Sequence, residues 1–196
     1  GPWRFYILFF LLMASMNGII LAGDIFNLFV FYEIFSVAAY VLAAFSMTRD
    51  ALEAGLKYLV FGTVAALFLL LGIAYVFMAT GQLNMAALSG QVKAVPAGAL
   101  TVISACFVLA LSTKMGAFPT HFWLPDAHSS AQTAVSALLS GVLVKVSVYA
   151  LIRICTLLFL DVTPAVFRVI LATGPMSVLA GHLMDLQKAD ITRLLA

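Results

Sequence analysis

Residues 112–132 read "STKMGAFPTHFWLPDAHSSAQ", and this stretch sets polar and helix-breaking residues between long apolar segments. Gly116, Pro119 and Pro125 disfavour a regular helix here. Non-helical backbone at membrane depth is tolerated only where protein or a water-filled cavity surrounds it. We therefore predict a broken helix, interrupted between Lys114 and Pro125, whose freed backbone groups hold water beside Lys114. The alternative interpretation is an ordinary loop at the membrane surface.

The composition of the whole chain is that of an integral membrane protein. Hydrophobic residues make up 64% of the 196 residues and charged residues 9%, and the mean hydropathy is +1.14. Apolar runs of about 20 residues fit helices that cross a ~30 Å hydrocarbon core, whereas barrel strands would be short and alternating. A net charge of +2 provides no basic face for nucleic acid. The sequence therefore predicts an all-α, polytopic transmembrane helix bundle in the lipid bilayer.

Six apolar segments are predicted to span the membrane as one transmembrane domain over residues 1–196. Their approximate bounds are 3–23, 25–47, 55–80, 98–118, 133–160 and 164–184, and a seventh segment is expected to begin at "ITRLLA". The first segment lacks the cleavage site of a signal peptide, and we expect a chain that begins part-way through a longer protein.

The basic residues predict an orientation for these spans. Alternating the spans places Arg4, Arg49, Lys188 and Arg193 on one side and Lys93 and Arg168 on the other. Short cytoplasmic loops carry an excess of Lys and Arg, so the first side is predicted to face the cytoplasm. The expected location is the cell (inner) membrane, as a multi-pass protein.

Four charged residues lie within apolar sequence: Glu33, Lys57, Lys114 and Lys145. An ionisable group at mid-bilayer costs at least ~2.5 kcal/mol, so such groups face the bundle interior, find partners and usually line an ion path. Glu33 is predicted to lie ~13 Å deep by helical rise. Because burial disfavours the charged form of lysine, Lys114 and Lys145 are candidate proton carriers. Structural ion pairs are the alternative, and Lys57 has one available with Glu53, one helical turn before it.

Two histidines and an aspartate follow the predicted break. His121, Asp126 and His128 lack the spacing of a metal site, so we expect no metal and no other cofactor. The histidines suit proton relay because their reference pKa is about 6.5, although a histidine at a helix end also serves as a hydrogen-bonded cap. For Asp126 we expect a structural role. Cys106 and Cys155 lie in apolar runs and are expected to be buried thiols without a disulfide.

Several motifs resemble one known family, the antiporter-like proton-translocating subunits of Mrp cation/proton antiporters, respiratory complex I and membrane-bound hydrogenases. The resemblance covers nearly the whole chain. It is carried by "GDIFNLFVFYEIFSVAAYVLAAF", "EAGLKYLVF", "KMGAFPTHFWLPDAHSSAQTAVSALLSGVLVKVSVYALIR" and "DLQKADITRLLA". The segments "GDIFNLFVFYEIF" and "GQLNMAAL" look most like the D subunit of Mrp antiporters and its relatives in membrane-bound hydrogenases.

The resemblance implies a fold of about fourteen helices with two inverted five-helix repeats, each holding a half-channel. The present chain would cover the first repeat and the helix after it, as a fragment or a split subunit. By motif, Glu33 matches the family's buried glutamate, Lys114 the lysine on the broken helix and Lys145 the lysine on the next helix. Glu33 and Lys114 would form a switching ion pair, and water with the hydroxyls near Ser136 and Ser140 would connect Lys114 to Lys145.

Ion movement is the function that these residues predict. We expect proton, or cation/proton, translocation by a subunit of a larger complex. The candidate residues are Glu33, Lys57, Lys114, His121, His128 and Lys145. The alternative is a structural membrane subunit that scaffolds a respiratory or hydrogenase complex and has no ion path of its own. A small-solute transporter would need a polar substrate pocket, which these charges do not indicate.

The sequence contains no motif for catalytic chemistry. No nucleophile with its base, nucleotide-binding loop or redox-cofactor motif is present. Any oxidoreductase chemistry would therefore belong to partner subunits, in a complex of the NADH:quinone oxidoreductase or membrane-bound hydrogenase type. The expected partners are other membrane subunits, and the expected ions are protons, with sodium as a second ion if the complex is an exchanger.

Overall fold

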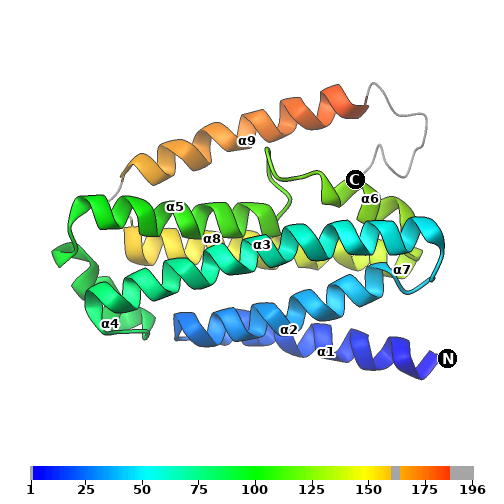
Figure 1. Cartoon of the computed structure of the whole chain (residues 1–196), viewed down its shortest axis with the longest axis horizontal. Helices are drawn as coiled ribbons and strands as arrows, with labels where there is room; N and C mark the ends of the chain where they lie inside the picture. The colour runs from blue at the N-terminus through cyan, green and yellow to red at the C-terminus, as the bar shows by residue number, and fades with distance from the viewer. Residues whose placement is uncertain (1, 160–163, 186–196) are drawn as a thin grey trace.

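The computed structural model describes residues 2–159 and 164–185, which form an elongated bundle of roughly parallel and antiparallel helices (Figure 1). The elements in chain order are α1 (Pro2–Leu21), α2 (Ile25–Ala43), α3 (Arg49–Thr80), α4 (Met85–Gln91), the short helix η1 (Val92–Ala94), α5 (Ala97–Lys114), α6 (Trp123–Ser130), α7 (Thr133–Leu138), the π-helix η2 (Leu139–Leu143), α8 (Val144–Ile154), the π-helix η3 (Cys155–Phe159) and α9 (Pro164–Asp185). No strand occurs in these ranges. The all-α prediction is confirmed.

Six helical segments are long and apolar enough to cross a membrane, as predicted. The fifth of them runs without interruption from Thr133 to Phe159 through α7, η2, α8 and η3. The third begins at Arg49 rather than near residue 55, because Thr48 caps its N-terminus and accepts a hydrogen bond from the Ala51 amide. The predicted seventh segment, and with it Lys188 and Arg193, lies outside the described residues.

The connection between the predicted spans 55–80 and 98–118 contains the short helix α4. Asn84 caps α4 through the amides of Ala86 and Ala87, much as Asp24 caps α2. The two capped turns pair with each other, because Ile25 N–H donates to the Leu83 carbonyl (2.9 Å). The turn before α2 is therefore joined to the turn before α4 at one end of the bundle.

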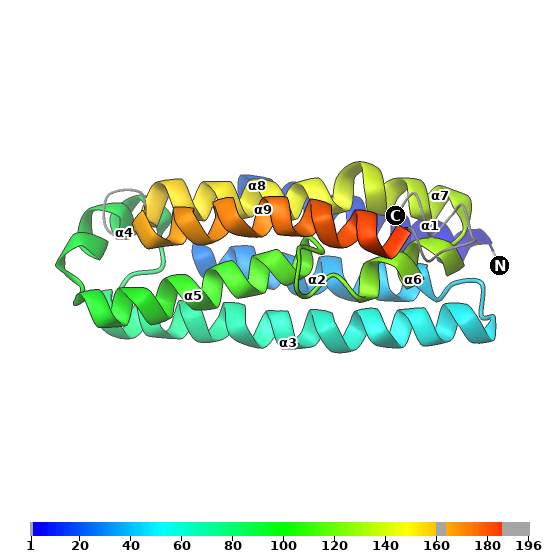
Figure 2. The same cartoon turned by 90° about the horizontal axis from the view of Figure 1, so that it is seen from above.

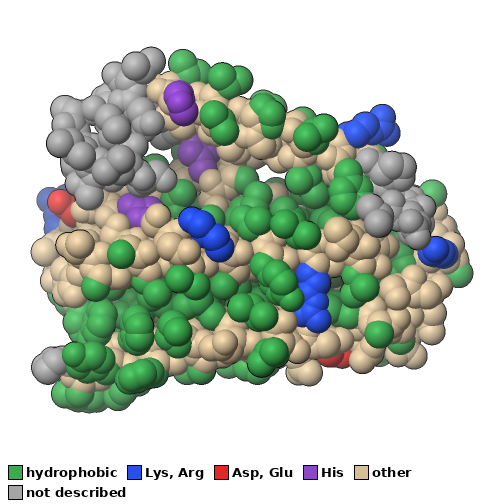
Figure 3. All heavy atoms as spheres, turned by 180° about the vertical axis from the view of Figure 1, so that it is seen from behind, with side chains coloured by type: hydrophobic (Ala, Val, Ile, Leu, Met, Phe, Trp, Pro, Cys, Tyr) green, Lys and Arg blue, Asp and Glu red, His purple; other side chains and the backbone are tan. Residues whose placement is uncertain are grey.

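Arg4 and Arg49 lie at one end of the bundle, near the N-termini of α1 and α3, whereas Lys93 lies in η1 at the other end (Figure 1). The core between the ends is apolar and aromatic, with Tyr32 and Phe107 fully buried. Apolar side chains also cover much of the outer surface, as Figure 3 shows for one face. Such a surface suits lipid or neighbouring membrane helices.

The fourth span is broken, as predicted. α5 ends at Lys114, near the middle of the bundle's long axis, and α6 starts only at Trp123 (Figure 2). Gly116 terminates α5 with a left-handed φ of 72°, a conformation that glycine adopts without steric cost. Pro125 was expected at the edge of the break but lies inside the first turn of α6, where its missing amide breaks no helical hydrogen bond.

Candidate functional site

Lys114 is the central residue of the site because it is charged, buried and placed where its helix ends. Its side chain is only 6% exposed. The ammonium donates a hydrogen bond to the Ser36 hydroxyl of α2 (Nζ–Oγ 2.8 Å) and lies over the ring of Tyr32, 5.2 Å from the ring centroid. Two residues of α2 thus contact the ammonium, and one of them, Ser36, lies 78 positions from Lys114 in the sequence.

Glu33 lies on the same helix as both of these partners. It precedes Ser36 by three residues, a spacing that puts the two side chains on one face of α2. One carboxylate oxygen, Oε1, is buried and accepts no hydrogen bond. In this structure the ammonium of Lys114 donates to the Ser36 hydroxyl. The predicted switching pair between Glu33 and Lys114 therefore stays a prediction about another state.

Two backbone carbonyls just before Lys114 accept hydrogen bonds within the protein, and the expected hydration of Lys114 stays a prediction. The Ser112 carbonyl accepts from the Ala117 amide (2.9 Å). The Thr113 carbonyl accepts from both the Gly116 amide (3.1 Å) and the Trp123 indole Nε1 (3.0 Å). The reason is the tight turn at Gly116, which folds the following amides back onto the end of α5.

Lys145 lies on α8, directly after the π-helix η2, and its side chain is exposed in the described part of the chain. The ammonium donates to the backbone carbonyl of Ser140. The Ser136 hydroxyl is engaged elsewhere, with His128 Nδ1 (2.9 Å). Ser136 and Ser140 were expected to lead from Lys145 towards Lys114, but their recorded contacts serve His128 and Lys145 separately. The relay remains a prediction.

The two histidines occupy different environments. His128 is 5% exposed, and its burial, together with the positive charge of Lys145, lowers the pKa of its imidazole. His121 lies in the break between α5 and α6, with ring centroids of Phe118 and Phe122 at 5.7 and 4.8 Å. Burial also lowers the pKa of His121. Both imidazoles are therefore biased towards the neutral form, which can accept a proton.

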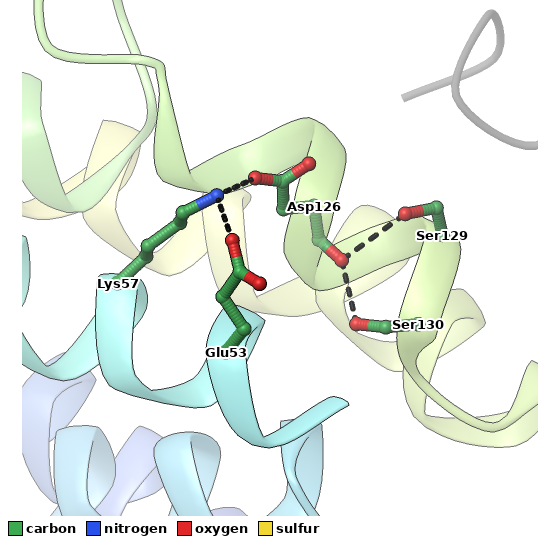
Figure 4. Close-up of polar contacts among 5 residues, drawn as sticks. All are labelled: Glu53, Lys57, Asp126, Ser129 and Ser130. Carbon is green, nitrogen blue, oxygen red and sulfur yellow. Dashed lines mark hydrogen bonds and ion pairs between the residues drawn. The ribbon is translucent and has the colours of Figure 1, made fainter. Parts of the chain in front are cut away.

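Lys57 belongs to a polar cluster at the end of the bundle that carries Arg49 (Figure 4). Its ammonium is 2.9 Å from Glu53 Oε1 and 2.7 Å from Asp126 Oδ2. The Asp126 carbonyl in turn accepts from the hydroxyls of Ser129 (3.2 Å) and Ser130 (2.6 Å). Sequence reasoning identified the Glu53 partner but missed Asp126, 69 positions away.

The cluster borders an open cavity of about 360 Å³. Its charged lining residues are Asp50, Glu53, Lys57 and Asp126. Lys57 is 43% exposed, so water reaches its ion pairs. In the described part of the chain, no group of three or more histidine, cysteine or carboxylate side chains could hold a metal ion. The site therefore combines a buried lysine at the break with a water-accessible charged cluster at one end.

Sequence reasoning missed three residues that contact the predicted site: Tyr32, Ser36 and Trp123. For Ser36 a signal was available, because its spacing from Glu33 puts both on one helix face. Tyr32 and Trp123 carry no comparable signal, since an aromatic residue in an apolar run is usually core. Tyr32 and Trp123 contact Lys114 and the end of α5 only because α2 and α6 pack there, which the local sequence does not indicate.

Comparison with known proteins identifies relatives over nearly the whole chain. The transmembrane family model of the NADH:quinone oxidoreductases and Mrp antiporters matches residues 22–196. The chain is 37% identical to the D subunit of the Na⁺/H⁺ antiporter of Alkalihalophilus pseudofirmus, covering 99% of this chain and 40% of that protein. It is 40% identical to the N subunit of the NADH-quinone oxidoreductase of Desulforudis audaxviator, covering 98% and 39%.

Solved structures agree with these relatives. A chain of the membrane-bound sulfane sulfur reductase, an archaeal respiratory membrane complex, superposes with a TM-score of 0.92 at 35% identity, covering 96% of this chain and 39% of that one. A chain of the Mrp complex from Dietzia sp. gives 0.85 at 30% identity, covering 96% and 36%. The present chain thus spans about two fifths of the length of its relatives. It belongs to the NADH:quinone oxidoreductase/Mrp antiporter transmembrane family.

Proposed function

We propose that this chain is part of a proton-translocating, antiporter-like subunit in which Glu33, Lys114 and Lys145 carry the charge movement. The observation that carries the proposal is Lys114, an almost fully buried ammonium at the end of a broken span. A charge at this position is costly, and ionisable residues inside membrane helices commonly belong to ion or proton paths. The family provides independent support, since its members include Na⁺/H⁺ antiporter subunits.

The proposed switch works through the choice of partner for Lys114. With the ammonium on Ser36, Oε1 of Glu33, one turn before Ser36 on α2, lacks a hydrogen bond and can accept one from a bound proton donor or from the lysine. Engagement of Lys114 by Glu33 would hold the lysine charged, and its release would favour transfer of the proton towards α8. His128 and His121, biased towards their neutral forms, are candidate intermediate acceptors.

The setting of this activity is also part of the proposal. The chain is membrane-integral, and we place the end carrying Arg4 and Arg49 on the cytoplasmic side of the cell membrane. Because the similar structures come from multisubunit membrane complexes, we expect the partners to be other membrane subunits. Protons are the expected ions, and exchange for a metal cation is suggested by the antiporter relatives.

A scaffold subunit without its own ion path is the second candidate, favoured by the similarity to chains of multisubunit membrane complexes. Substitution of Glu33 by Gln in the full-length subunit separates the two. The amide keeps the size of the side chain and removes its charge, so a translocator should assemble normally and lose coupled proton uptake in sealed vesicles. Assembly measured by gel filtration is the control. Full uptake by an assembled Glu33→Gln complex would reject the switch.

A further inference from the structure

The short helix α6 is held against α3 by two side-chain contacts. Asp126 of α6 pairs with Lys57 of α3 (2.7 Å), and Trp123 stacks flat on Tyr58, with ring centroids 4.0 Å apart and an interplanar angle of 2°. Lys57 and Tyr58 are adjacent on α3, and Trp123 and Asp126 lie one turn apart on α6. We name these four residues the α6 clamp.

The clamp reaches the end of α5 through Trp123. This side chain is 1% exposed, and its indole Nε1 donates to the Thr113 carbonyl (3.0 Å), one residue before Lys114. A displacement of α6 along α3 would have to break this hydrogen bond or move the last turn of α5 with it. The position of Lys114 therefore depends on the Lys57–Asp126 pair through α6, Trp123 and the last turn of α5.

The α6 clamp is anchored on one long helix, α3, whereas its ion pair is open to water. α3 is a continuous helix of 32 residues. Lys57 also pairs with Glu53 on its own helix (2.9 Å), so it keeps a partner if Asp126 moves away. The open cavity beside Asp126 is also lined by Lys57, so water can reach the pair.

We infer that the α6 clamp positions Lys114 for proton transfer, and that Lys57 acts in it as a fixed positive charge and not as a proton carrier. The inference rests on the proposed function, because positioning matters only if Lys114 exchanges protons. Lys57, Tyr58, Trp123 and Asp126 are positioning residues: their ion pair, ring stack and hydrogen bond are with residues other than Lys114, and Trp123 reaches it through the end of α5.

The experiment uses the full-length subunit in its assembled complex, in sealed vesicles, and measures proton uptake against pH. Lys57→Arg and Asp126→Glu keep the ion pair and should retain uptake within about twofold. Lys57→Met and Asp126→Asn remove it and should each lower uptake by about fivefold and displace the midpoint of the pH profile. The double variant should be no worse than either single one, since both break the same contact.

Two further variants test the specificity of the contact. Glu53→Gln removes the other carboxylate partner of Lys57 without touching α6, and it should lower uptake clearly less than Asp126→Asn does. Trp123→Phe keeps an aromatic ring on Tyr58 but loses the indole N–H, and it should lower uptake as Asp126→Asn does.

Three results would overturn the inference. If an assembled Lys57→Arg complex lost uptake, Lys57 would have to release a proton, because arginine effectively never does. If Asp126→Asn behaved like the parent, or if Glu53→Gln were equally damaging, the contact with α6 would not matter. Normal uptake by Lys114→Met and Glu33→Gln would instead reject the proposed function itself.

Discussion

Replacing Lys114 by methionine should stabilise the folded protein and at the same time stop transport. Methionine has a similar length and no charge, so it can occupy the space of the lysine without leaving a cavity. Among the described residues, the recorded partners of the Lys114 ammonium are the Ser36 hydroxyl and the face of Tyr32, and no carboxylate lies within ion-pair distance of it.

The magnitude follows from these contacts. A hydrogen bond from a charged group contributes about 1.5–3 kcal/mol, and a cation–π contact about 0.5–2 kcal/mol. Burying an ion costs several kcal/mol even after relaxation, and hydrophobic replacement of buried ion pairs is often neutral or stabilising by about 1–4 kcal/mol. We therefore expect Lys114→Met to raise the free energy of unfolding by a value in that range, and proton uptake to fall by about a hundredfold or more.

The assay is thermal unfolding of the full-length subunit in detergent, paired with proton uptake by the assembled complex in vesicles. Ser36→Ala is the matched control: it keeps the lysine and removes its hydrogen-bond acceptor, so it should lower the melting temperature. A Lys114→Met protein that melts at a lower temperature and transports normally would show that the lysine stabilises the fold and carries no proton, which would refute both expectations.

Three other substitutions and one control test separate parts of the structure. Lys145→Arg keeps the charge but cannot release a proton, so the complex should assemble and lose most of its proton uptake; near-normal uptake would make Lys145 a fixed charge. Gly62→Ala should lower stability by about 1–3 kcal/mol, because the new Cβ would lie 1.7 Å from the Tyr40 hydroxyl, whereas Gly98→Ala, with no atom within 4 Å, should not. Burial and the Lys145 charge lower the pKa of His128, so the unfolded chain binds its proton first as pH falls. The folded protein is therefore expected to keep its full stability above about pH 6.5 and to lose stability as the pH falls below that value. The melting temperature of His128→Gln should fall less over the same pH range than that of the parent.

The spans could be predicted from the sequence because bilayer thickness imposes a length on every apolar run. The break after Lys114 was also predictable, since Gly116 and Pro119 act on the local backbone. The contacts of the site could not be predicted in the same way. The Lys114–Ser36 and Lys57–Asp126 bonds join positions 78 and 69 residues apart, and they depend on the packing of α2 and α3 against the broken span. The π-helix before Lys145 has no local sequence signature that we could use.

The end of α5 at Lys114 has an electrostatic consequence of its own. The aligned peptide dipoles of a helix place roughly half a negative charge at its C-terminus, which stabilises a cation there by about 0.3–1 kcal/mol and by up to ~2 kcal/mol in partly buried sites. Lys114 is the last residue of α5, so its ammonium lies in this field. A continuous helix would carry its dipoles past the lysine and offer no terminus. The interruption of the span therefore gives Lys114 a negative potential that persists whether or not Glu33 is protonated.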